Sequence, residues 1–158
     1  MMQKWHCAVN TKTSMKGHWY IICRSKQLRE KPLARQVLGE HLVAFRDADG
    51  RASVLKDRCS HRNMALSRGT VTDKGVRCSY HGWTYGSDGH CTDIPASCES
   101  CESYAKIKVP AYSVIEKQGV VWVWMGKTDG PTEPIGEPLD FPMFAESGWH
   151  HWYMERHF

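Results

Sequence analysis

The stretches that decide the fold are Cys59-Ser60-His61 and Cys78-Ser79-Tyr80-His81, which are separated by sixteen residues. Each stands in a loop that follows a predicted strand, so two loops each offer one thiolate and one imidazole. Four such ligands can hold one tetrahedral zinc ion, or a two-iron cluster with both Cys on one iron and both His on the other. Their spacing alone allows either metal centre.

The residues around these pairs favour iron. In zinc fingers a Cys pairs with a second Cys across about two to four residues, and the Cys-x-His pair at 59–61 is tighter than that. Two matching loops that face each other also suit a flat cluster. In such a cluster an added electron localises on the iron that carries the neutral imidazoles. The His side is then the port for electrons, and the potential should depend on pH.

Residues 59–62 (CSHR) and 78–83 (CSYHGW) resemble the Rieske [2Fe–2S] motif of the ring-hydroxylating oxygenases. The resemblance covers roughly residues 17–126, and it includes Asp57, ALSRG at 65–69, GSDG at 86–89 and IPA at 94–96. It implies an all-β domain, built as a Rieske-type antiparallel sandwich or barrel with a small cluster-binding subdomain of two loops.

The resemblance also implies a role for each candidate ligand. Cys59 and Cys78 would bind the inner iron of the [2Fe–2S] cluster. His61 and His81 would bind the outer iron, and the loop at Pro95 would help to cover the cluster.

Two positions indicate the branch of the Rieske group. Respiratory-complex members are similar in carrying an additional Cys in each loop, and here Met64 and Tyr80 stand near those positions, which excludes a disulfide between the loops. Trp83 follows Gly82 where the high-potential respiratory type has a hydroxyl residue that donates a hydrogen bond to the cluster. Because such a donor raises the potential, its absence implies the low-potential class.

Outside the loops, the sequence consists of short β-type runs separated by turn signals, which predicts an all-β fold. Single strands are predicted at residues 19–24, 35–38, 105–109, 112–116 and 120–125. Hairpins are predicted to pair 41–46 with 51–55, 70–72 with 76–78, and 83–85 with 90–92, each across a turn that ends in Gly. The run at 120–125 is the most apolar, and its Trp122 and Trp124 are expected to pack in the core from one side of the strand.

The chain divides into three parts. Residues 1–16 are expected to be an N-terminal extension, residues 17–126 the Rieske domain, and residues 127–158 a Pro-rich connector and the start of a missing catalytic domain. Residues 149–158 read as an aromatic, strand-like segment. The sequence lacks the motif of two His and one carboxylate that holds the mononuclear iron of an oxygenase. The nearest candidates differ from it in order and spacing and are interpreted as ordinary residues: His150, His151, Glu155 and His157.

Length and composition exclude several classes of protein. The 158 residues, 41% of them hydrophobic and 24% charged, suit one globular domain. Lys and Arg are spread along the chain without a run, which argues against a nucleic-acid surface. No apolar run approaches the roughly 20 residues of a membrane helix, and the N-terminus lacks a secretory core, so a soluble cytoplasmic protein is expected. The Cys residues beyond the two loops are expected to be free surface thiols (Cys98 and Cys101) or small apolar or incidental residues (Cys7, Cys23 and Cys91).

The resemblance to the ring-hydroxylating oxygenases implies one-electron transfer through a Rieske cluster, as the electron-relay domain of an aromatic-ring-hydroxylating mono- or dioxygenase. The chain alone should pass an electron without hydroxylating a substrate, because dioxygen needs an open iron site. The resemblance implies a ferredoxin or flavin reductase as donor, delivery to a mononuclear non-haem Fe(II) in the parent oxygenase, and a homotrimer of that parent. The alternatives are a complete stand-alone Rieske-type ferredoxin and a redox-silent zinc module.

Overall fold

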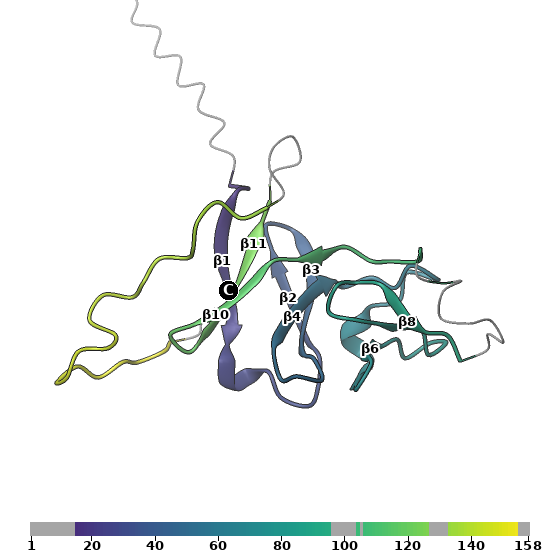
Figure 1. The fold of residues 1–158 in the computed structure, drawn as a ribbon, viewed down its shortest axis with the longest axis horizontal. Coiled ribbons are helices and arrows are strands. Elements are labelled where there is room, and N and C mark those ends of the chain that lie inside the picture. The colour runs from purple at the N-terminus through teal and green to yellow at the C-terminus, as the bar shows by residue number, and fades with distance from the viewer. Residues whose placement is uncertain (1–14, 96–103, 105, 127–132, 155–158) are drawn as a thin grey trace, which may run out of the picture.

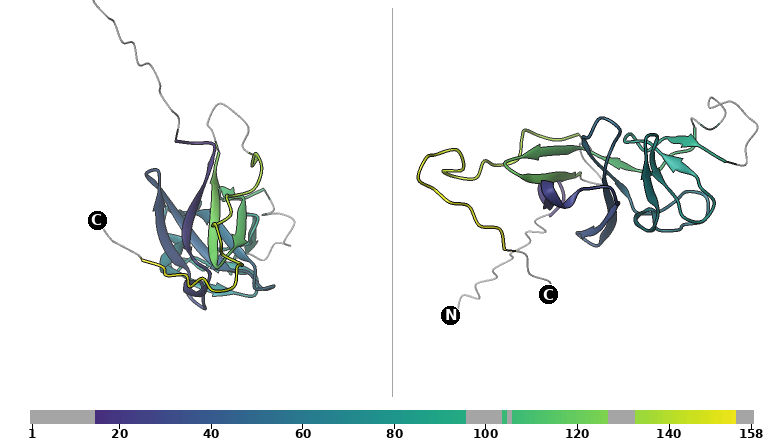
Figure 2. Two further views of the ribbon diagram at one scale, coloured as in Figure 1. Left: turned by 90° about the vertical axis from the view of Figure 1, so that its left-hand side faces the viewer. Right: turned by 90° about the horizontal axis from the view of Figure 1, so that it is seen from below.

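Three antiparallel sheets follow one another along the long axis of the molecule in the computed structural model, which describes residues 15–95, 104, 106–126 and 133–154 (Figures 1 and 2). The first sheet holds β1 (His18–Arg24), β11 (Val120–Met125) and β10 (Val114–Lys117), in that order. The middle sheet holds β2 (Leu33–Val37), β3 (Glu40–Arg46), β4 (Ala52–Lys56) and β9 (Ala111–Tyr112). The third sheet holds β5 (Thr70–Thr72), β6 (Gly75–Arg77), β7 (Thr84–Tyr85) and β8 (Cys91–Asp93). Short 3-10 helices follow β1 (η1, Ser25–Gln27) and precede β5 (η2, Leu66–Arg68). The predicted all-β class is confirmed.

The middle sheet is buried on both faces, because β3 carries four consecutive apolar residues with no exposed surface. Successive side chains of a strand point to opposite faces, so this run serves two cores. Leu42 and Ala44 pack toward the first sheet, whereas Val43 and Phe45 pack toward the third. The core between the middle and third sheets lies directly beneath the two Cys/His loops.

The three predicted hairpins form, and no strand boundary shifts by more than one residue. Cys59 and Cys78 follow β4 and β6, as expected. The predicted strand at 112–116 is in fact two strands, since Tyr112 pairs with Val54 in the middle sheet and Val114 pairs with Val123 in the first. The chain crosses between the sheets at this point.

The strand predicted at 105–109 is wrong for its described residues. They contribute an isolated bridge between Lys108 and His90, together with single hydrogen bonds to the loop before β8 and to β8 itself. Pro110 follows directly and has no N–H to extend a ladder, so pairing stops there.

Residues 133–154, the terminal strap, run along the first sheet without forming a strand (Figure 1). The strand-like prediction is therefore wrong for residues 149–154. The strap is held by the β10–β11 turn, where Lys117 pairs with Asp140 at 2.8 Å and the Phe141 N–H donates to Gln118 Oε1 at 2.6 Å. The strap is therefore fixed by side chains of the β10–β11 turn, and its backbone does not pair with a neighbouring strand.

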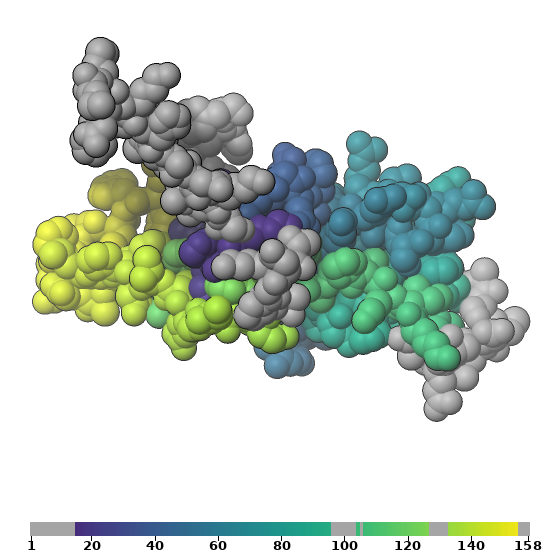
Figure 3. All heavy atoms as spheres, turned by 90° about the horizontal axis from the view of Figure 1, so that it is seen from above, coloured from purple at the N-terminus to yellow at the C-terminus, as the bar shows by residue number. Residues whose placement is uncertain are grey.

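The two Trp of β11 are buried and lie on one side of the strand, as predicted, but this is the side opposite the core that contains Val121 and Val123. Trp122 and Trp124 are 9% and 4% exposed, and they contact Phe141 of the strap and Trp19 of β1 at ring distances of 5.9 and 5.5 Å. The space-filling view places the strap at one end of the molecule and the third sheet toward the other (Figure 3).

Among the described residues, no helix has the length and apolar character needed to span a bilayer. Several residues singled out from the sequence lie outside the described part: Cys7, Cys98, Cys101, Glu155 and His157.

Candidate metal centre

Two loops with the same backbone hydrogen bonds carry the four candidate ligands. In each loop the Cys N–H donates to the carbonyl five residues later, and the N–H four residues later donates back to the Cys carbonyl. The two distances are 2.8 and 2.9 Å in loop 59–64 and 2.8 and 3.1 Å in loop 78–83. The fourth residues after each Cys, Asn63 and Gly82, have positive φ angles of 57° and 75°. Asn and Gly tolerate this left-handed conformation better than other residues, so the sequence suits both turns.

Neighbouring residues brace the two loops. Asp57 accepts hydrogen bonds from the Ser67 N–H at 2.7 Å and from Ser67 Oγ at 2.6 Å, which ties the start of the first loop to η2. Pro95 lies against the second loop, because a Cβ added to Gly82 would stand 2.8 Å from Pro95 Cγ. Each loop is thus held in place by a residue that the family resemblance had singled out.

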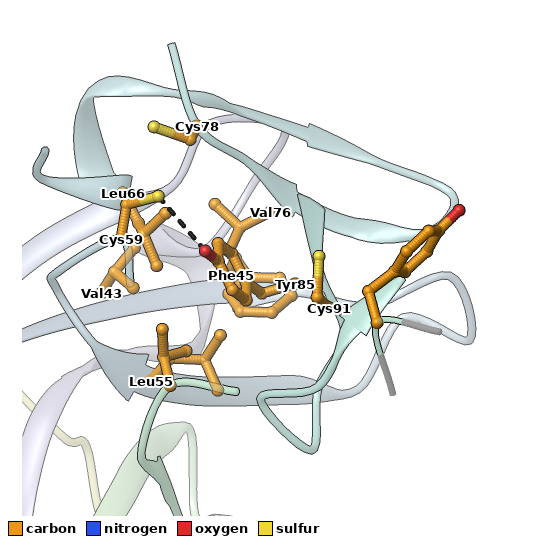
Figure 4. Packing of buried hydrophobic residues seen from close by; sticks show 11 residues of the cluster. Val43, Phe45, Leu55, Cys59, Leu66, Val76, Cys78, Tyr85 and Cys91 are labelled. Carbon is orange, nitrogen blue, oxygen red and sulfur yellow. Dashed lines mark hydrogen bonds between the residues drawn. The ribbon is translucent and has the colours of Figure 1, made fainter. Parts of the chain in front are cut away.

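The two candidate thiols are buried side by side. Cys59 and Cys78 are 2% and 3% exposed, and both are free of disulfides. Figure 4 shows their sulfurs at the same edge of the buried cluster that contains Tyr85. Burial raises the pKa of Cys78, the nearby Cys59 raises it further, and the backbone N–H groups of Tyr80 and His81 lower it. N–H groups directed at a sulfur favour its thiolate, which is the form that binds a metal.

The two candidate imidazoles lie at the surface above the thiols. His61 and His81 are exposed, and their ring centroids are 4.7 Å apart. The Trp83 ring stacks on His61 at 4.5 Å with an interplanar angle of 10°, and Tyr80 contacts His81 at 3.8 Å. Partial loss of water lowers the pKa of His61, and His81 and Arg62 lower it further. A low pKa favours the neutral imidazole that a metal requires.

The four side chains line one pocket, together with Arg62, Met64, Tyr80 and Trp83. They are arranged as a buried pair of thiols and an exposed pair of imidazoles. Among the described residues, no three His, Cys, Asp or Glu side chains group as ligands of a single ion. A donor set of two sulfurs on one side and two nitrogens on the other fits a two-iron cluster of the Rieske type.

Tyr85 is a residue of the centre that sequence analysis missed. Its hydroxyl lies 3.2 Å from Cys59 Sγ and 2.9 Å from Ser60 Oγ, and it accepts a hydrogen bond from the Ser60 N–H at 3.3 Å. Burial raises the pKa of Tyr85, and the contact with Cys59 raises it further, so the phenol keeps its proton. The prediction of a low potential considered only position 83, where Trp stands, and did not take this second hydroxyl into account. The one signal in the sequence is its place four residues after His81, at the end of the second loop.

Other candidates lie away from the loops. Cys23 is buried in the core of the first sheet, and Cys91 is buried beneath the third, where burial raises the pKa of its thiol. His151 contacts the Phe144 ring at 4.6 Å within the strap. None of these three side chains lines the pocket that the four candidate ligands share, although Cys91 belongs to the same buried cluster as Cys59 and Cys78.

The similarity to known proteins covers the whole β domain and not only the two loops. A family model described as "Rieske [2Fe-2S] domain" matches residues 18–113. The chain is 40% identical over 131 residues to the 3-chlorobenzoate-3,4-dioxygenase oxygenase subunit of Comamonas testosteroni, an alignment that covers 81% of this chain and 30% of the relative. It is 37% identical over 125 residues to the phthalate 4,5-dioxygenase oxygenase subunit of Pseudomonas putida, with 75% and 28% covered. The chain thus spans about a third of the length of these curated relatives.

The solved structures that resemble this chain are also oxygenases. Dicamba monooxygenase with non-haem iron and dicamba superposes with a TM-score of 0.73 at 29% identity, covering 84% of this chain and 39% of that chain. The carbazole-bound oxygenase and ferredoxin complex of carbazole 1,9a-dioxygenase superposes with a TM-score of 0.62 at 37% identity, covering 73% and 30%.

Proposed function

Since this chain belongs to the Rieske [2Fe–2S] domain family, we propose that it passes single electrons through a [2Fe–2S] cluster as the electron-relay domain of an oxygenase. Cys59 and Cys78 would hold the inner iron, and His61 and His81 the outer iron. When bound, the cluster supplies a reversible one-electron redox centre.

The observation that carries this proposal is the separation of the two donor pairs by depth. The thiols are 2% and 3% exposed, whereas both imidazoles are exposed. Buried thiolates need partners for their charge, and N–H groups of the second loop and the Tyr85 hydroxyl face the sulfurs. Imidazoles at the surface allow a partner protein to approach the electron port directly.

Two aromatic residues support these roles. Trp83 lies parallel to the His61 ring, which restricts the rotation of that imidazole and shields one of its faces from water. The raised pKa of Tyr85 keeps its hydroxyl protonated, so it donates to the sulfur when the Cys59 thiol is ionised. Both residues act on a ligand and need not touch a substrate.

The oxygenase role rests on the relatives, which are oxygenase subunits about three times as long as this chain. We propose that residues 17–126 are the Rieske domain, that residues 1–16 precede it, and that residues 127–158 lead toward a catalytic domain with a mononuclear non-haem iron. The complete oxidoreductase would be a mono- or dioxygenase, with a ferredoxin or flavin reductase as donor and a trimer as its assembly. Oxygenase relatives favour this proposal over a stand-alone ferredoxin.

Metal content and spectroscopy test the cluster directly. The chain is purified without oxygen, its iron and zinc are measured, and the dithionite-reduced protein is examined by electron paramagnetic resonance. About two irons per chain and the rhombic, low-average-g signal of a His-ligated cluster are expected. One zinc per chain with no signal overturns the proposal in favour of a structural zinc module.

Substitution of the imidazoles tests the ligand assignment. His61→Cys and His81→Cys should each lower the potential markedly or abolish the cluster, because thiolate donates more negative charge than imidazole. His90→Cys is the matched control, since His90 is also exposed but contacts Asp88 in the turn before β8. Unchanged spectra and potentials in both loop variants would remove these residues as ligands.

A further inference from the structure

The positive charge of the chain is concentrated in the segment that forms the metal centre. Residues 56–83 hold six Lys and Arg and two Asp, a net charge of +4, which equals the net charge of the whole chain. The other 130 residues hold fifteen basic and fifteen acidic residues. The rest of the protein therefore has no net charge.

Of these six basic residues, four form no ion pair with an acidic side chain in the described part of the chain: Lys56, Arg58, Arg62 and Arg68. By contrast, Lys74 and Arg77 face Asp93 at 3.1 and 3.8 Å. Arg62 lines the same pocket as His61 and His81, and Arg58 donates to Asn63 Oδ1 at 2.7 Å within the first loop.

We define the cationic rim as Arg58, His61, Arg62, Tyr80 and His81, all of which are exposed. A bound cluster would not cancel its charge. In the oxidised state, two ferric ions, two sulfides and two thiolates sum to zero, and reduction adds a single negative charge. The two guanidinium groups thus present uncompensated positive charge beside the electron port.

Building on the function proposed above, we propose that the protein that reduces this centre docks on the cationic rim through an acidic surface. Opposite charges steer two proteins together and raise their association rate, most strongly at low ionic strength. The terminal strap does not cover the rim, because it lies at the other end of the molecule (Figures 1 and 3). An acidic donor could therefore approach while the strap holds its place on the first sheet.

Stopped-flow reduction tests this proposal. The oxidised, cluster-loaded chain is mixed with a reduced, negatively charged plant-type [2Fe–2S] ferredoxin, whose potential is lower than that of a Rieske centre. The second-order rate constant should fall as ionic strength rises. Arg62→Gln should lower the rate at low ionic strength on the order of two- to fivefold and weaken its salt dependence, because one rim charge is lost.

Two further variants distinguish an effect of the rim charge from an effect of net charge or of altered folding. Arg51→Gln removes the same charge from the β3–β4 turn, where Arg51 is 73% exposed, and should leave the rate unchanged. Arg62→Lys should restore the rate. A rate that is insensitive to salt, or that is equal in Arg62→Gln and Arg51→Gln, overturns the acidic docking surface. Failure of dithionite to reduce the wild-type centre would instead overturn the proposed function itself.

Discussion

Replacement of Tyr85 by Phe should lower the reduction potential of the centre. The Tyr85 hydroxyl lies 3.2 Å from Cys59 Sγ and is buried together with it. A reduced cluster carries one more negative charge than an oxidised cluster, and part of this charge resides on the thiolate sulfurs. The hydrogen bond from Tyr85 is therefore stronger in the reduced state, and its removal destabilises that state.

The size of the shift follows from the strengths of hydrogen bonds. A hydrogen bond to a neutral group contributes about 0.5–1.5 kcal/mol and one to a charged group about 1.5–3 kcal/mol, so one added charge strengthens the bond by about 1 kcal/mol. For a one-electron couple about 59 mV corresponds to 1.4 kcal/mol, which gives a decrease of roughly 40 mV in Tyr85→Phe. Because burial raises the pKa of Tyr85, the hydroxyl keeps its proton well above neutral pH, and the shift should be the same across the neutral range.

Protein-film voltammetry of the wild type and the variant measures this difference. Tyr112→Phe is the matched control, because the Tyr112 hydroxyl also donates a hydrogen bond, which is partly buried, but to Glu40 Oε2 at 2.7 Å. It should leave the potential unchanged. An unchanged or raised potential in Tyr85→Phe, with two irons retained per chain, would refute the role assigned to this hydroxyl.

Two stability predictions follow from the same structure. Gly82→Ala should destabilise the chain by about 2 kcal/mol or more in urea unfolding, since Ala is strained at positive φ and its Cβ would meet Pro95; Gly39→Ala, at positive φ but with no atom within 4 Å, should cost only about 1 kcal/mol. Equal losses would rule out the Pro95 contact. The Tyr112 hydroxyl, followed by Lys16, lowers the pKa of Glu40 below 4.5, so Glu40 contributes stability above that value and loses it as pH falls through its folded pKa. Glu40→Gln should therefore be about 1 kcal/mol less stable than the wild type at pH 7 and equally stable at pH 2, and a constant difference would contradict this.

The sequence predicted the parts of the fold that local patterns determine. Turns such as Asp-Ala-Asp-Gly at 47–50 specify hairpins through residues that tolerate positive φ, and these hairpins formed. Which sheet a strand joins depends on contacts distant in sequence. Residues 112–116 have a continuous β-type composition, yet the chain leaves the middle sheet after Tyr112 and enters the first sheet at Val114. Nothing local marks that crossing.

The four candidate ligands could be predicted from the sequence, because Cys and His at short spacing in a loop are themselves a metal-binding pattern. Cys59, His61, Cys78 and His81 were singled out by their spacing, and the structure brings their loops together. Tyr85 escaped because a Tyr in a strand is usually a core residue, and its contact with Cys59 arises from folding the third sheet over the first loop.

The burial of the thiols determines which variants can test the metal centre cleanly. Cys59 and Cys78 belong to the same buried cluster as Phe45 and Tyr85, so replacing either Cys changes the core as well as the ligand set. A Ser at these positions would replace a buried sulfur of that cluster by a smaller and more polar hydroxyl, and a loss of the metal cluster would then have two causes. The imidazoles are exposed, so their replacement removes a ligand with little effect on packing. Unfolding curves of metal-free protein should therefore be unchanged in the His variants and shifted in the Cys variants, and for this reason the His variants carry the decisive test of the ligand assignment.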